Sequence, residues 1–92
     1  MVKANELSCD QKLKIFNNAI QSVEMTYRHD LQTINLTLNK EIQECAKIQS
    51  NNLQSACIQL ANEQFNLKQL KATQTKDQLI YRYKESLLSE CQ

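Results

Sequence analysis

Apolar side chains recur along the first half of the chain at the spacing of one helical face. Ser8 and Gln11 match a capping box at the start of this series. The series advances by three or four residues at each step without a break, and a mean step of about 3.6 is the period of a straight α-helix. The pattern therefore predicts one helix over residues 9–48. Its stripe consists of Cys9, Leu13, Phe16, Ile20, Val23, Tyr27, Leu31, Ile34, Leu38, Ile42 and Cys45.

A short polar segment and a second helical stretch follow. Residues 49–52 read Gln-Ser-Asn-Asn, which predicts a turn. Asn51 or Asn52 is expected either to end the first helix in the left-handed conformation or to cap the next one. The chain has no glycine and no proline, which favours long uninterrupted helices. We predict a second helix over residues 53–90.

The four cysteines lie almost symmetrically about the predicted turn. Cys45 and Cys57 flank it, and Cys9 and Cys91 lie near the two ends of the chain. A chain that folds back at 49–52 brings Cys45 to Cys57 and Cys9 to Cys91. We therefore predict two disulfides that staple an antiparallel hairpin at both ends. In the chain-entropy model the short loop contributes about 3 kcal/mol of stability and the long loop on the order of 4 kcal/mol.

The register set by the cysteines also pairs apolar residues along the hairpin. These pairs predict the packing seam between the two helices. The fold class is thus all-α, a long coiled-coil-like helical hairpin in a single domain that spans residues 1–92. The predicted pairs are Leu13 with Leu88, Ile20 with Tyr81, Leu31 with Leu70, Ile34 with Leu67, Ile42 with Leu60, and Ile48 with Leu53.

The second arm contains one segment that does not fit a continuous stripe. Residues 71–77 have little apolar content, and Val23 and Tyr27 would face Gln78 and Gln74 there. The apolar stripe before this segment is displaced by about a quarter turn or more from the stripe after it. A kink or a break near residues 72–76 is therefore expected, and a three-helix chain with helices at 9–48, 53–72 and 76–90 is the alternative.

The sequence contains no pattern typical of a catalytic or cofactor site. His29 is the single histidine, and a phosphate-binding loop needs glycines that the chain lacks. The closest cysteines are twelve residues apart, whereas zinc ligands come as close pairs. The net charge of +1 and the lack of an apolar run near the roughly 18 residues of a membrane span predict neither nucleic-acid binding nor membrane insertion. We expect no enzyme, no metal and no cofactor.

Two paired helices bury little apolar surface, so a partner surface is expected. The partner is another protein or a second copy, which would form a four-helix bundle. The residues expected to contact it are apolar and lie off the predicted seam: Leu7, Met25, Leu36, Phe65 and Ile80.

The stapling principle resembles that of the twin CX3C and CX9C proteins of the mitochondrial intermembrane space. Each of their helices carries two closely spaced cysteines, a signature that this chain lacks, so no family is assigned. The even cysteine count fits an oxidising compartment. We expect a non-enzymatic periplasmic or secreted binding protein, such as an inhibitor, immunity factor or assembly adaptor. The alternative is a cytosolic coiled-coil chaperone or scaffold with reduced cysteines.

Overall fold

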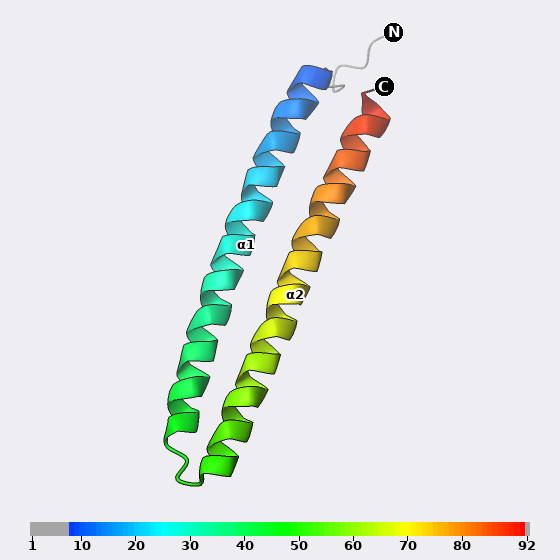
Figure 1. Cartoon of the computed structure of the whole chain (residues 1–92). Coiled ribbons are helices and arrows are strands. Elements are labelled where there is room, and N and C mark those ends of the chain that lie inside the picture. Colours follow the sequence, from blue (N-terminus) through cyan, green and yellow to red (C-terminus); the bar gives the residue numbers. More distant parts are fainter. Residues whose placement is uncertain (1–7, 92) are drawn as a thin grey trace.

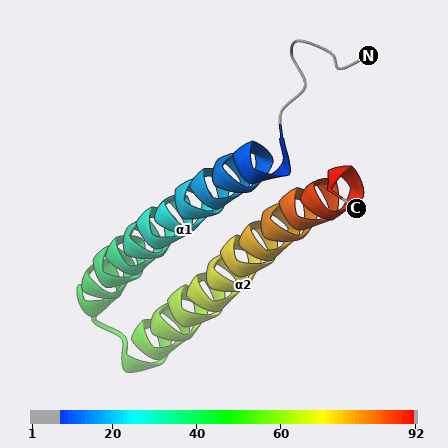
Figure 2. The ribbon, with the colours of Figure 1, turned by 90° about the horizontal axis from the view of Figure 1, so that it is seen from above.

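Two long antiparallel helices make up the fold (Figure 1). The computed structural model describes residues 8–91. Helix α1 spans Cys9–Ala46 and helix α2 spans Asn51–Glu90. The helices lie side by side in both views (Figures 1 and 2), so the N-terminal end of α1 lies next to the C-terminal end of α2. The hairpin measures 75 × 17 × 14 Å, which confirms the predicted long helical hairpin.

The start of α1 forms the predicted capping box. The Ser8 hydroxyl oxygen accepts a hydrogen bond from the Gln11 backbone N–H at 3.2 Å. The Gln11 side-chain oxygen accepts one from the Ser8 backbone N–H at 3.0 Å. These two bonds satisfy N–H groups that a helix start leaves without intrahelical partners.

The turn is shifted two residues towards the N-terminus relative to the prediction. Helix α1 ends at Ala46 rather than 48, and α2 begins at Asn51 rather than 53. Ser50 caps α2, because its hydroxyl accepts from the Leu53 backbone N–H at 3.5 Å. The Gln54 side chain donates to the Ala46 carbonyl at 3.2 Å. A carbonyl at the end of α1 is thereby satisfied from α2.

Both roles predicted for Asn51 or Asn52, a left-handed end of the first helix and a cap of the second, were therefore wrong, because Ser50 is the cap. No residue from 8 to 91 has a positive φ, and Asn51 and Asn52 already belong to α2. A left-handed residue serves to satisfy the last carbonyls of a helix. Here Gln54 takes part of that role, and Lys47 stays in the right-handed region.

Helix α2 is continuous through residues 72–76. The prediction of a single second helix is thus confirmed, and the alternative of a break that gives three helices was wrong. The polar segment packs against α1 through Tyr27. The Tyr27 hydroxyl and the Thr73 hydroxyl lie 2.9 Å apart in a hydrogen bond. The Lys76 ammonium lies over the Tyr27 ring, 4.5 Å from its centroid, which is cation–π geometry. Polar contacts replace apolar pairing at this level of the hairpin.

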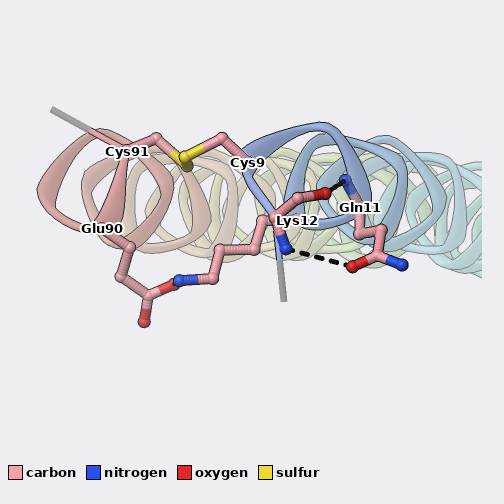
Figure 3. A network of polar contacts seen from close by, with 6 residues as sticks. Cys9, Gln11, Lys12, Glu90 and Cys91 are labelled. Atoms are coloured by element: carbon pink, nitrogen blue, oxygen red, sulfur yellow. Dashed lines mark hydrogen bonds and ion pairs between the residues drawn. A yellow bond between two sulfur atoms is a disulfide. The ribbon is translucent and has the colours of Figure 1, made fainter. Parts of the chain in front are cut away.

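Both predicted disulfides are present. Cys9 pairs with Cys91 and Cys45 with Cys57, each with a Cα–Cα distance of 5.6 Å, within the usual range for a disulfide. Figure 3 shows the first bridge joining the two helix ends, with Lys12 reaching towards Glu90 beside it. The Lys12–Glu90 ion pair is 3.5 Å long. Both ends of the hairpin are thus cross-linked.

The predicted register is confirmed, but the predicted contact face of α2 was wrong. Leu53, Leu60, Leu67 and Leu70, which the sequence placed in the seam, are all exposed. The residues of α2 that turn towards α1 are instead buried or half-buried, and they include Cys57, Ile58, Ala61, Phe65, Ala72, Thr73, Lys76, Leu79, Ile80 and Leu87.

The cysteines explain this rotation of α2. Cys57 and Cys91 are 34 residues apart, which is about 160° around a straight helix. Both must reach α1, so the contact face lies in the arc between them. Ala61 and Phe65 lie inside that arc, about 40° and 80° from Cys57, whereas Leu60 lies about 60° outside it.

The two disulfides are expected to stabilise the hairpin unequally. The loops have sequence separations of 82 and 12, and the chain-entropy model gives about 4.5 and about 3 kcal/mol for them. In guanidinium unfolding followed by circular dichroism, Cys9→Ala/Cys91→Ala should lose more stability than Cys45→Ala/Cys57→Ala. Equal midpoints for both double variants and the parent would contradict this account.

The Tyr27–Thr73 hydrogen bond is expected to contribute about 1 kcal/mol. Tyr27→Phe removes the hydroxyl and leaves the part-buried Thr73 hydroxyl without this partner, so it should lower the free energy of unfolding by about that amount. Tyr81→Phe is the matched control, because Tyr81 is 63% exposed. A double-mutant cycle with Thr73→Val measures the coupling. If the two Tyr→Phe variants are equally stable, the bond has no net value.

Candidate protein-interaction surface

The hairpin has a very small core and a large apolar surface. Among residues 8–91 only Cys45 and Ala61 are buried, at 1% and 5% exposure. Two helices leave most of each other's circumference uncovered. Apolar patches beyond those normal for a monomer mark contact sites. The exposed apolar side chains are therefore the candidate contact site.

The residues predicted to contact a partner do not form one surface. Met25 and Leu36 are 68% and 70% exposed, and eleven residues bring them to the same side of α1. Phe65 and Ile80 are half-buried on the side of α2 that turns towards α1. Leu7 lies outside the described residues. Met25 and Leu36 thus remain as a small pair on α1.

A longer apolar row runs along α2, and its apolar members were predicted to lie in the seam between the helices. We call it the outer row. Its five apolar members are 48–63% exposed. Its members are seven residues apart in the sequence. This spacing is the signal that could have identified the row as a contact surface distinct from the seam. The outer row consists of Leu53, Leu60, Leu67, Gln74, Tyr81 and Leu88.

The outer row winds around α2 rather than running straight. Seven residues fall about 20° short of two full turns, so the row shifts by about 100° from Leu53 to Leu88. It therefore has two parts. The turn-end leucines are Leu53, Leu60 and Leu67. The distal patch is formed by Tyr81 and Leu88 together with Leu70, which is 56% exposed and lies on the same side of α2, eighteen residues before Leu88.

A shallow groove runs between α1 and α2 beside the turn-end leucines. Near the turn its hollow measures 570 Å³, and Cys45, Cys57, Leu60 and Ala61 are part of its lining. Further along the hairpin a second hollow is lined by Asp30 and by residues of α2. Leu60 thus belongs both to the outer row and to the groove.

The cysteines and the acidic side chains bear on the chemistry open to the described residues. All four cysteines are joined in disulfides, so none is available as a thiolate ligand or nucleophile. No group of three or more histidine, cysteine, aspartate or glutamate side chains from 8 to 91 is placed to hold a metal ion. Neither α1 nor α2 has a stretch that is long and apolar enough to cross a membrane.

Comparison of the chain with known protein families, with characterised proteins and with solved structures finds no match. The case for the candidate surface therefore depends on the geometry of the hairpin alone.

Polar substitution is expected to separate the outer surface from the seam. Leu70→Gln should change the free energy of unfolding by less than about 0.5 kcal/mol, because the side chain is already exposed. Phe65→Gln should destabilise the hairpin by roughly 2 kcal/mol, because a half-buried aromatic side chain loses its packing. Denaturant unfolding of the oxidised proteins measures both. A greater loss for Leu70→Gln would restore the seam predicted from sequence.

Proposed function

We propose that this protein is a non-enzymatic binding module of an oxidising compartment, which contacts another protein through its helical faces. Inhibitors, immunity factors and assembly adaptors are of this kind. The observation that carries the proposal is the outer row, an exposed line of apolar side chains along α2. The partner protein contacts the distal patch, and Met25 and Leu36 on α1 offer a second apolar site.

The placement of the distal patch supports a helical partner. Leu70, Tyr81 and Leu88 lie within about 20° of one another around α2, so they form one line along the helix. The distal patch therefore suits an amphipathic helix that places its own apolar residues against these three side chains.

The cross-links support both the compartment and the rigidity. Two disulfides are compatible with an oxidising compartment. They also hold the two helices together before a partner arrives, so less conformational entropy is lost on binding. A reduced hairpin with so small a core would be much less ordered, which favours this proposal over a cytosolic scaffold.

Site-specific photo-cross-linking in the cells that make the protein tests the proposal. A photoreactive residue at Tyr81 is expected to give a defined adduct with a different protein. The same residue at Asn62 is the control, because Asn62 is exposed and lies about 100° around α2 from Tyr81. Equal labelling at both positions, or no adduct at Tyr81, would contradict binding through the distal patch.

A free-thiol count on protein taken from the same cells tests the compartment. We expect all four cysteines to resist alkylation until a reductant is added, because they are paired. Four thiols that react without reductant would favour the cytosolic scaffold with reduced cysteines.

A further inference from the structure

One face of the hairpin is hollowed along much of its length. Three hollows follow one another between the helices. The first two share Asp30, Ala72 and Thr75, and the third begins one turn further on, at Thr37. We call this side the groove face. The turn-end leucines border the groove face. Leu53, Leu60 and Leu67 lie four residues before Cys57, Gln64 and Lys71, which line the hollows. Four residues correspond to about 40° around a helix.

Two threonines on the α1 side of the groove face already have partners for their hydroxyl groups. The Thr33 hydroxyl donates to the His29 carbonyl at 3.1 Å. The Thr37 hydroxyl donates to the Thr33 carbonyl at 3.0 Å. Because both hydroxyls bond back to their own helix, neither needs water as a partner. Another helix can therefore cover Thr33 and Thr37 without leaving either hydroxyl group unsatisfied.

The charges along the groove face are divided between the two helices. The lining carries acidic residues from α1, with Lys40 as the exception, and basic residues from α2. Among residues 8–91, none of the ion pairs joins Asp30 to Lys68 or Lys71. Glu44 pairs with Lys47, and Lys76 pairs with Asp77. Asp30, Lys68 and Lys71 are in none of these pairs, so they are available to another molecule. The acidic set is Asp30, Glu41 and Glu44, and the basic set is Lys68, Lys71 and Lys76.

We propose that a second copy of this chain docks on the groove face, so that two hairpins form an antiparallel four-helix bundle. A two-fold axis parallel to the helices places α1 of each copy over α2 of the other. The acidic side of one copy then meets the basic side of the other, and Asp30 lies across from Lys71 of the second copy. The proposal goes beyond the proposed function, because it gives the turn-end leucines a partner of their own.

The same arrangement covers the turn-end leucines. In this register Leu67 of one copy lies at the same height along the bundle as Thr33 and Thr37 of the other copy. Leu60 lies about two helical turns closer to the hairpin turn. Leucine side chains then pack against threonine methyl groups, and all neighbouring helices run antiparallel. The distal patch lies outside the interface and stays open for a different protein.

The groove face is large enough for a stable dimer. A standard interface buries about 800 Å² on each partner. A face 17 Å wide provides that area over about 47 Å of length. The hairpin is 75 Å long, so the hollowed part with its flanks suffices.

Sedimentation of the oxidised protein tests the dimer. We expect the dimer fraction to rise with concentration. Leu60→Asp and Leu67→Asp should each raise the dimer Kd roughly 100-fold, because each substitution places two unpaired carboxylates, one from each copy, in the buried interface. Leu70→Asp is the matched control and should leave the Kd unchanged, because Leu70 lies about 100° around α2 from Lys71. Circular dichroism checks that the variants stay helical.

A parent protein that stays monomeric up to about 1 mM would overturn the proposal, because specific complexes bind more tightly. Equal weakening by Leu70→Asp and Leu60→Asp would also overturn this choice of face.

A mixing experiment tests the crossed pairing of the helices. Asp30→Lys alone and Lys71→Asp alone place like charges across the interface, so each homodimer should weaken. In the mixed dimer one copy is basic at positions 30 and 71 and the other is acidic at both, so each contact again joins opposite charges. The mixed dimer should therefore bind at least about tenfold more tightly than either homodimer. Charges that repel within one chain are unaffected by mixing. No gain on mixing would overturn the arrangement of α1 over α2.

Photo-cross-linking separates this inference from the proposed function. A photoreactive residue at Leu60 should give an adduct of twice the chain mass. Adducts of Tyr81 with another protein, without self-adducts at Leu60, would overturn the dimer and leave the proposed function standing. Self-adducts at Leu60 without any adduct at Tyr81 would support the dimer and count against a different protein as partner.

Discussion

The two disulfides fix how α2 is turned towards α1, and the rest of the surface follows from that rotation. Cys57 and Cys91 both have to come within bonding distance of cysteines on α1. They lie about 160° apart around a straight helix, so only the arc between them can face α1. Ala61 and Phe65 fall inside this arc. The leucines of the outer row fall outside it.

This rotation leaves Leu60 and Leu67 exposed. Burial of apolar area is the main source of stability in small folds, and here only Cys45 and Ala61 of residues 8–91 are fully buried. The cross-links compensate by restricting the unfolded chain. At the level of Tyr27 the seam is held by a hydrogen bond and a cation–π contact. The protein is thus stabilised at its ends and middle while its leucines stay available.

The available surface is divided by the helical period itself. A seven-residue row on a 3.6-residue helix drifts around the helix axis. The drift carries the outer row from the edge of the groove face, at Leu53, to the far side of α2, at Leu88. One continuous pattern thereby serves two surfaces. The turn-end leucines suit a second copy with exchanged charges, and the distal patch suits a helix of another protein.

The sequence by itself determined the elements, their antiparallel register and the cysteine pairing. These depend on local periodicity, on the Ser8 capping box and on distances along the chain, which helix geometry converts directly into position. It also marked Met25 and Leu36 as exposed. The cap at Ser50 and the contact face of α2 were decided only by the tertiary structure. Gln54 satisfies a carbonyl from the other helix, and Phe65 rather than Leu60 turns inward because both disulfides must close on one rigid helix.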